Sequence, residues 1–214
     1  MISLIHPSRG RATKAFSTLF YWLSKASKTI EIEHILSLDI DDTQMSLYNT
    51  LFKESIVIYG NNSNLVQATN AAAKVAHGNI LVYLSDDFKC PDNWDLLITE
   101  KTKHKSGSKW VLRVDDCHQS LDAKLITMPI MSIQLYKQLG YFFHPAYGSI
   151  YADADLFHVC QKNGWVIYAN DLKFIHEHYC AGLAPVDDTY RRSEKNIESG
   201  KLTFSNRKKQ NFPI

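Results

Sequence analysis

Two adjacent carboxylates, Asp86 and Asp87, follow an apolar run from Ile80 to Leu84 in this chain of 214 residues. Like charges side by side repel each other, so such a pair is usually kept where a cation or a set of hydrogen-bond donors offsets the repulsion. Carboxylate oxygens beside a phosphate are typical ligands of Mg²⁺ or Mn²⁺. The pair therefore indicates a cation-assisted phosphate site, and the plain alternative is a solvated turn in which Asp86 begins a loop.

The elements around this pair alternate between strand and helix, which is typical of a mostly parallel sheet flanked by helices. We expect strands over residues 2–5, 31–39, 55–59 and 79–84, and helices over residues 12–27, 43–54 and 65–77. The second half favours a helix from residue 92, a strand over 109–114, an apolar run over 125–131, helices over 132–139 and 151–162, and strands over 165–168 and 172–176. Ligands bind at the carboxyl edge of such sheets, and Asp86 and Asp87 fall at that edge.

Other charged residues follow the first two predicted strands. The first strand leads into His6-Pro-Ser-Arg-Gly-Arg11, in which Arg9 and Arg11 are planar donors suited to a diphosphate. Asp39 and Asp41 lie at the C-terminal end of the second strand, where a carboxylate can accept a hydrogen bond from a ring N–H of uracil or guanine. Both pairs have a plain alternative, as solvated charges or turn formers.

Composition excludes several classes of protein. The net charge of +2, from 24 basic and 22 acidic residues, is too even for nonspecific nucleic-acid binding. No apolar stretch reaches the length of a membrane span, and Ser8, Arg9 and Arg11 interrupt the N-terminal apolar run. We therefore expect no transmembrane segment and no signal peptide, and we predict a cytoplasmic protein. The 4 cysteines are widely separated and are expected to be free thiols.

The order of these motifs resembles the GT-A-fold glycosyltransferases, especially the family 2-like inverting enzymes. The resemblance spans residues 2–180 and is carried by Pro7-Ser-Arg-Gly-Arg11, Asp39–Asp42, Asn70-Ala-Ala-Ala-Lys-Val-Ala-His-Gly-Asn79, Leu81-Val-Tyr-Leu-Ser-Asp-Asp87, Tyr151-Ala-Asp-Ala-Asp-Leu156 and Phe174-Ile-His-Glu-His178. It implies an α/β fold with a single GT-A (Rossmann-like) domain at residues 1–180. Residues 1–90 would bind the nucleotide sugar, residues 91–180 the acceptor, and residues 181–214 would form a polar tail or lid.

The resemblance also implies a role for individual residues. Asp87 and His176 correspond to metal ligands of the family, while Ser85 replaces the first aspartate of its Asp-x-Asp motif. Asp153 corresponds to the general base, with Asp155 as the alternative, because two residues along a helix point about 200° apart. The residues implied to bind the nucleotide sugar are Pro7, Arg9, Arg11, Asp39, Asp41, Asn70, Asp86 and Arg191.

The implied reaction is the transfer of a sugar from a UDP or GDP sugar to a hydroxyl of a glycan or other acceptor. Inversion is expected, with Mn²⁺ or Mg²⁺ as cofactor. Tyr190, Arg191 and Arg192 are expected to form a lid that is mobile without donor and ordered with it. The aromatic run from Tyr141 to His144 either packs in the core or stacks on a sugar face.

His176 and His178 alternate along a predicted strand, so they are expected to point to opposite faces, with only one reaching the metal.

A metal-dependent phosphoesterase could use both histidines together with Asp86 and Asp87, and a non-catalytic nucleotide- or glycan-binding module is also consistent with the fold. A sugar nucleotidyltransferase is disfavoured, because the loop from His6 to Arg11 has too few glycines.

Overall fold

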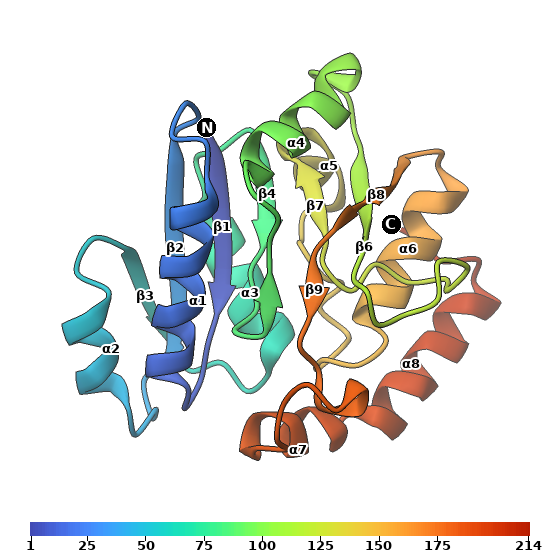
Figure 1. Cartoon of the computed structure of the whole chain (residues 1–214). Helices are drawn as coiled ribbons and strands as arrows, with labels where there is room; N and C mark the ends of the chain where they lie inside the picture. Colours follow the sequence, from blue (N-terminus) through green and yellow to red (C-terminus); the bar gives the residue numbers. More distant parts are fainter.

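A seven-stranded sheet runs through the chain, and the structure, a computed structural model, describes all 214 residues (Figure 1). The strand order is β3-β2-β1-β4-β7-β6-β8, and a second, two-stranded sheet pairs β5 with β9. The strands are β1 (Ile2–Pro7), β2 (Ile32–Asp39), β3 (Ile56–Gly60), β4 (Ile80–Tyr83), β5 (Phe88–Lys89), β6 (Val111–Asp115), β7 (Ile130–Ser132), β8 (Val166–Lys173) and β9 (Ile175–His176). The helices are α1 (Ala12–Lys25), α2 (Met45–Leu51), α3 (Leu65–Lys74), α4 (Trp94–Thr102), α5 (Ile133–Leu139), α6 (Ala152–Lys162), α7 (Asp188–Glu194) and α8 (Ile197–Lys209).

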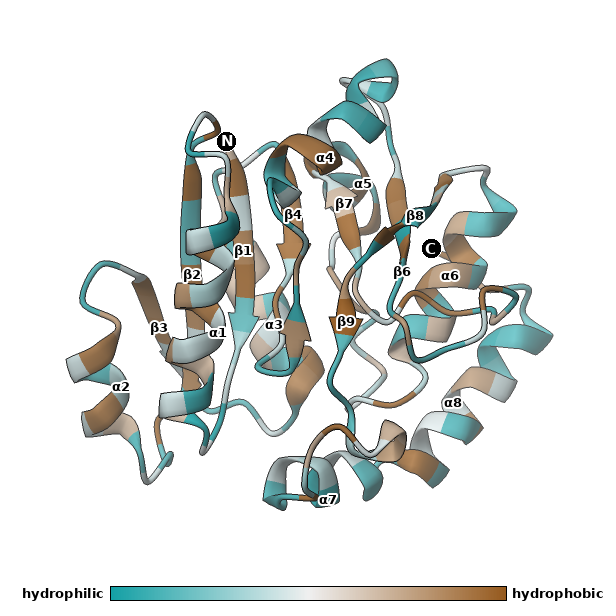
Figure 2. Cartoon of the chain, viewed as in Figure 1, coloured by the Kyte–Doolittle hydropathy of each residue, from teal (hydrophilic) through white to brown (hydrophobic).

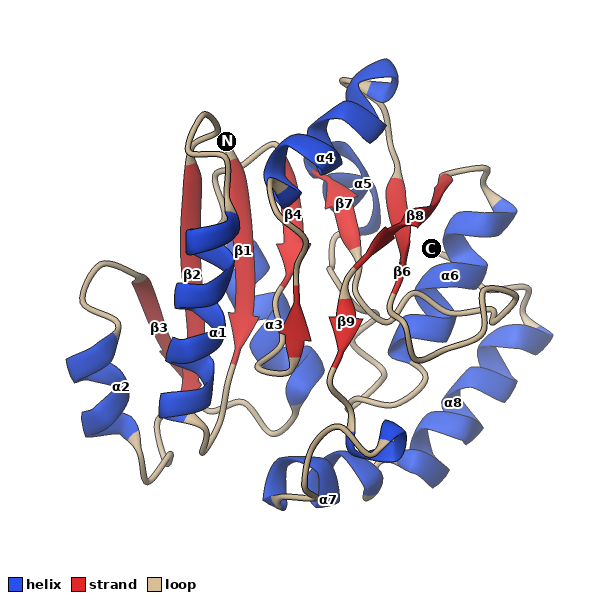
Figure 3. Cartoon of the chain, in the orientation of Figure 1, coloured by secondary structure: helices blue, strands red, loops and turns tan.

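The predicted mostly parallel sheet is confirmed. Strands β3, β2, β1 and β4 run parallel to one another, β6 and β8 are also parallel, and β7 alone is antiparallel to both of its neighbours. Helices lie on both faces of the sheet (Figure 3), as crossover connections between parallel strands require. The carboxyl ends of β1, β2 and β4 therefore meet at one edge of the sheet, which is the lower edge in Figure 1.

The central strands are apolar because both faces of the sheet are covered. All six residues of β1 are buried, and β1 and β4 are coloured as mainly hydrophobic in Figure 2. On the covering helix α1, Trp22 is fully buried and its Nε1 donates to the carbonyl of Phe88 at 2.9 Å. That bond fixes β5, the short strand directly after the acidic pair, so core packing positions the site.

The elements differ from the sequence prediction mainly near the C-terminus. The strand expected over residues 165–168 continues to Lys173 as β8, while β9 is separate and contains only Ile175 and His176. The polar tail forms α7 and α8, which lie below and beside the carboxyl edge of the sheet (Figure 1). None of the helices has the length and apolar content that crossing a membrane requires. All four cysteines are free, as predicted.

Candidate functional site

A cleft of about 430 Å³ lies at the carboxyl edge of the sheet, a size typical of small-ligand sites. Its walls come from the segments after β1, β2 and β4, the start of α6, the segment around β9, and α7. The residues predicted from the sequence that line it are Pro7, Arg9, Arg11, Asp39, Asp86, Asp87, Asp153 and His176. Four other predicted residues do not line it: Asp41, Asn70, Asp155 and Arg191.

Asp86 is held by hydrogen-bond donors on both carboxylate oxygens. Oδ1 lies 2.8 Å from Nε2 of His6, and Oδ2 accepts from Oγ of Ser8 at 3.0 Å. Nη1 of Arg11 lies 4.0 Å from the same Oδ2. Asp86 and Asp87 are only 5% and 4% exposed, so the alternative of a solvated turn is wrong.

Asp87 also has partners on both oxygens. Oγ of Ser85 donates to Oδ1 at 2.6 Å, the hydroxyl of Tyr190 donates to Oδ2 at 2.8 Å, and Nε2 of His176 lies 3.5 Å from Oδ2. Burial by itself would raise the pKa of Asp87, but His176, Ser85 and Tyr190 outweigh it and hold this pKa well below its usual range. Ser85 thus provides a donor that orients Asp87.

The two predicted metal ligands, Asp87 and His176, fit a divalent ion only in part. Their separation of 3.5 Å exceeds a normal N–H···O hydrogen bond and suits two ligands that share one ion. Nδ1 of His176 is buried without a hydrogen-bond partner. No group of three or more His, Cys, Asp or Glu side chains is arranged to hold an ion. The protein therefore offers two ligands, and phosphate oxygens of a bound substrate would complete the set, as is usual for Mg²⁺.

His178 lines the same cleft as His176, so the expectation that they point to opposite faces is wrong. The alternation argument fails because β9 ends at His176 and His178 lies in the turn that follows, where its Nδ1 accepts from the backbone N–H of Cys180 at 3.3 Å. The rings of His176 and His178 are 4.8 Å apart, and His178 stacks on His118 at 5.3 Å. His118 was not identified from the sequence.

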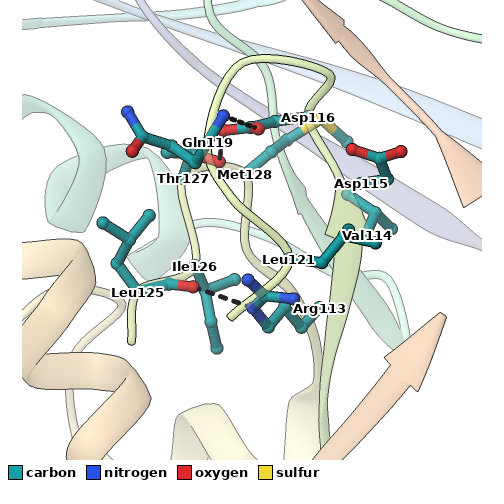
Figure 4. Close-up of a pocket in the computed structure, with 10 residues that line it drawn as sticks. All are labelled: Arg113, Val114, Asp115, Asp116, Gln119, Leu121, Leu125, Ile126, Thr127 and Met128. Carbon is teal, nitrogen blue, oxygen red and sulfur yellow. Dashed lines mark hydrogen bonds between the residues drawn. The ribbon is translucent and has the colours of Figure 1, made fainter. Parts of the chain in front are cut away.

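The segment between β6 and β7 brings further residues to the cleft, and buried polar contacts order it (Figure 4). Nε of Arg113 donates to the carbonyl of Leu125 at 3.1 Å. The carboxylate of Asp116 accepts from the backbone N–H of Gln119 at 2.7 Å and from Oγ1 of Thr127 at 2.5 Å. Residues of this segment that line the cleft are His118, Gln119 and Thr127.

Arg9 lies at the Asp39 end of the cleft and is engaged by carboxylates. Nη1 donates to Oδ2 of Asp39 at 2.6 Å, and Nη2 donates to Oδ2 of Asp41 at 2.8 Å. The hydrogen bond that Arg9 donates to Asp41 is the main cause of the raised pKa of Arg9. The side chain of Asp41 is 72% exposed and does not line the cleft, so Asp41 influences the cleft only by holding Arg9. Oδ1 of Asp39 accepts from Nδ2 of Asn62 at 3.0 Å, and Asn62 was also missed from the sequence, although it lies in a turn-forming loop.

Arg11 is the guanidinium close to the acidic pair. Its Nε and Nη2 each donate to a carboxylate oxygen of Asp187 at 2.7 Å, and its plane lies 4.5 Å from the ring centre of Tyr190. Burial opposes the charge of Arg11, yet Asp187, Asp86 and Asp87 together raise its pKa. A planar donor that already binds one carboxylate in two places is suited to bind a phosphate in the same way.

Asp153 and Asp155 begin α6 and have different surroundings. Asp153 lines the cleft, and burial raises its pKa, with the charge of Asp116 acting in the same direction. Asp155 is buried away from the cleft, where its Oδ2 accepts from the hydroxyl of Tyr147 at 2.9 Å and from Nε of Arg207 at 2.6 Å. Asp155 therefore holds α8 against α6, and Asp153 is the carboxylate available for chemistry.

Asn70 and Arg191, both predicted to bind the nucleotide sugar, lie outside the cleft. Oδ1 of Asn70 accepts from the backbone N–H groups of Phe142 and Phe143, each at 2.9 Å. Asn70 thus fixes the aromatic run, whose Phe143 is mainly core yet lines the cleft. Arg191 is exposed, and its neighbour Arg192 lines the cleft, because successive residues on a helix point about 100° apart.

Three side chains hold α7 against the acidic pair. Tyr190 donates to Asp87, Asp187 binds Arg11, and Oγ1 of Thr189 donates to the carbonyl of Arg9 at 3.1 Å. These contacts engage Asp87, which the sequence resemblance assigns to the metal, and Arg9 and Arg11, which it assigns to the nucleotide-sugar donor. The tail therefore lies against the site, and its role as a lid that the donor orders stays a prediction.

We expect Asp187→Asn to make the segment from residue 182 to 193 more sensitive to protease. Asparagine keeps the N-terminal cap of α7, where Asp187 accepts from the N–H groups of Thr189 and Tyr190, but loses the ion pair with Arg11. Cleavage should be faster than in wild type because the free energy needed to open this segment locally becomes smaller. Asp188→Asn, which changes the exposed neighbouring carboxylate, is the matched control. Equal cleavage in both variants, or equal cleavage of wild type with and without nucleotide and Mn²⁺, would contradict the lid.

Comparison with protein-family models gives no match, and comparison with curated protein sequences gives none either. Solved structures do match. TarS from S. aureus, residues 1–349, in complex with UDP-GlcNAc is 15% identical with a TM-score of 0.63, covering 92% of this chain and 66% of that one. The mannosyltransferase PcManGT from Pyrobaculum calidifontis with GDP-Man and Mn²⁺ is 14% identical with a TM-score of 0.67, covering 96% and 64%.

Glucosyl-3-phosphoglycerate synthase from Mycobacterium tuberculosis, with Mn²⁺, UDP and glucosyl-3-phosphoglycerate, is 11% identical with a TM-score of 0.62, covering 93% of this chain and 78% of that one. The chain spans only 36% of the longer TarS structure. At identities of 11 to 15%, these matches establish the fold alone, which is the GT-A (Rossmann-like) fold.

Proposed function

We propose that this chain is a glycosyltransferase that moves a sugar from a nucleoside-diphosphate donor to an acceptor hydroxyl, with inversion at the anomeric carbon. The observation that carries the proposal is the convergence of the acidic pair, Arg11 and Asp153 on one cleft at the carboxyl edge of a GT-A-like sheet. Structures of the same fold that bind UDP-GlcNAc or GDP-Man support the donor class. Fold alone does not determine activity, so the proposal rests on the site.

The donor binds along the cleft from Asp39 to Asp87. Asp39 accepts from a ring N–H of uracil or guanine, with Asn62 and Arg9 beside it as donors to ring carbonyl groups. Arg11 binds the diphosphate when Asp187 releases it, and its fork of donors favours two parallel hydrogen bonds. This arrangement suits a UDP or GDP sugar.

Asp87 and His176 would hold the cofactor, with diphosphate oxygens as its further ligands. Mn²⁺ or Mg²⁺, when bound there, supplies neutralisation of the negative charge that builds on the leaving nucleoside diphosphate. The low pKa of Asp87 keeps it ionised as a ligand, and the hydrogen bond from Ser85 restricts its rotation. An imidazole beside a carboxylate favours Mn²⁺ over Mg²⁺.

Asp153 accepts the proton of the acceptor hydroxyl as that oxygen attacks the anomeric carbon. Burial raises the pKa of Asp153, which makes its carboxylate a stronger base than an exposed aspartate. Inversion requires this base on the face of the sugar opposite the leaving diphosphate. Asp153 comes from α6, an element separate from the turn between β4 and β5 that carries Asp86 and Asp87.

A panel of nucleoside diphosphates, measured by thermal shift with and without Mn²⁺, tests the proposal. We expect UDP or GDP to raise the melting temperature, and Mn²⁺ to increase the shift. A ligand at a hundred times its Kd adds about 2.7 kcal/mol to the free energy of unfolding. Asp39→Asn should reduce the shift by the nucleotide, while Asp122→Asn, which changes an exposed loop carboxylate, should leave it unchanged.

The same panel separates the alternatives. Release of sugar from the corresponding sugar nucleotide in the presence of Mn²⁺ would support a transferase, since water can replace the acceptor. A nucleotide that binds without any turnover favours a binding module, and hydrolysis of simple phosphate esters favours a phosphoesterase. Failure of every nucleoside diphosphate to shift the melting temperature would refute the proposed function.

A further inference from the structure

A chain of side-chain hydrogen bonds runs from Asp86 across the first two strands. Oδ1 of Asp86 lies 2.8 Å from Nε2 of His6, Nδ1 of His6 lies 2.9 Å from Nε2 of His34, and Nδ1 of His34 lies 2.7 Å from Oγ of Ser55. His6 is completely buried and His34 is 7% exposed. Two directly bonded imidazoles in a pair of buried strands require an explanation, because aliphatic side chains usually fill such positions.

A second chain of hydrogen bonds reaches the other oxygen of Asp86. The backbone N–H of Arg11 donates to the hydroxyl of Tyr48 at 3.0 Å, the hydroxyls of Tyr48 and Ser8 are 2.7 Å apart, and Ser8 donates to Oδ2 of Asp86 at 3.0 Å. The Tyr48 oxygen accepts from Arg11, so its own hydrogen is free to donate to Ser8. Every hydrogen of this chain therefore points toward Asp86.

The hydrogen bonds from Ser55 through His34 and His6 also all donate in the direction of Asp86. An ionised carboxylate only accepts hydrogen bonds, so Nε2 of His6 carries the hydrogen. Burial and the neighbouring His6 lower the pKa of His34 well below its usual value, so His34 is neutral. With its hydrogen on Nε2, His6 accepts at Nδ1, so His34 donates from Nε2 to Nδ1 of His6, and Ser55 donates to Nδ1 of His34. Both rings are then Nε2–H tautomers.

The ring of Phe52 shields the hydrogen-bonded histidines from solvent. Its ring stacks on His34 at 5.8 Å and meets the edge of His6 at 6.5 Å, and Phe52 is itself buried. Hydrogen bonds are stronger, and unpaired polar groups more costly, in such surroundings. The packing of Phe52 therefore makes the alignment of the two rings costly to disturb.

We propose that His6 and His34 are positioning residues for Asp86. They form a relay of hydrogen bonds with one direction that, together with Tyr48 and Ser8, fixes the orientation of the Asp86 carboxylate, so that its remaining acceptor lone pairs face the cleft. The relay is a property of the protein itself. Its effect on nucleotide binding rests on the proposed function.

Imidazole nitrogen NMR of the isotope-labelled full chain at neutral pH tests the relay without any ligand. We expect both His6 and His34 to show an unprotonated Nδ1 and a protonated Nε2. Assignment uses His6→Gln and His34→Gln, each of which removes one pair of signals. A protonated Nδ1 on either ring overturns the proposal, whether the cause is the opposite tautomer or a charged ring. This result stands even if no nucleotide binds to the wild-type protein, which would refute the proposed function alone.

The affinity for a nucleotide then distinguishes a positioning role of His6 from a packing role. Using the nucleoside diphosphate that gives the largest thermal shift, we expect His6→Leu to weaken binding about tenfold, because a hydrogen bond to a charged group is lost. His6→Gln keeps a donor for Asp86 and should bind within about threefold of wild type. A packing role predicts the reverse order, since leucine suits an apolar strand better than glutamine.

His104→Leu, which changes an exposed histidine far from the relay in sequence, is the matched control and should bind as wild type. Equal affinity of His6→Leu and wild type, or equal loss in His6→Leu and His6→Gln, overturns the positioning role. If His6→Leu does not fold, His34→Leu replaces it, with His34→Gln as the rescue, because glutamine still donates to Nδ1 of His6.

Discussion

Asp153→Asn lowers the rate of sugar transfer by about a hundredfold or more, while nucleotide affinity stays close to wild type. Asparagine has nearly the shape of aspartate but cannot accept the proton of the acceptor hydroxyl. Because burial raises the pKa of Asp153, the acid limb of kcat/KM against pH in the wild type should also lie above the range of an ordinary aspartate. Initial rates and pH profiles with the donor found in the nucleotide panel provide the measurement.

Asp155→Asn is the informative comparison for this variant. Asp155 accepts two hydrogen bonds from Arg207 and one from Tyr147, so its replacement should lower the melting temperature by loosening α8 and leave the transfer rate less affected. Transfer that survives in Asp153→Asn and is lost in Asp155→Asn would show that the wrong carboxylate carries the chemistry. A product that keeps the anomeric configuration of the donor would exclude the inverting mechanism.

Asp87→Asn abolishes measurable turnover and removes the increase in thermal shift that Mn²⁺ produces. The loss should be at least about a hundredfold, as for removal of a group that stabilises transition-state charge. Asparagine is preferred to alanine because Ser85, Tyr190 and His176 all contact the carboxylate, and alanine would leave buried polar groups unpaired. Calorimetric titration with Mn²⁺ and nucleotide measures the binding part separately from the rate.

Ser85→Ala is the matched control for Asp87→Asn. Ser85 donates to Asp87 and is not a proposed ligand, so its loss should lower the rate far less than loss of Asp87 and preserve the response to Mn²⁺. Wild-type turnover in Asp87→Asn would refute the assigned metal ligand. Loss of the Mn²⁺ response in Ser85→Ala alone would place the ion elsewhere.

The sequence by itself determined the fold class and the edge of the sheet where the site lies. Alternation of apolar strands with amphipathic helices leaves few arrangements, and a parallel sheet brings the ends of its strands to one edge. Residues that directly follow a central strand, such as Asp86 and Asp87, were therefore placed correctly without any knowledge of tertiary contacts. Asp39, the last residue of β2, was placed for the same reason.

The tertiary structure decided which side chains at that edge face the cleft and which partners they have. Asp155 pairs with Arg207 from α8, and Asn70 bonds the backbone at Phe142, so neither reaches the cleft. His178 joins His176 on one wall because the strand ends between them. Such outcomes depend on contacts between residues far apart in the chain and on where a strand stops, and local periodicity contains no information about either.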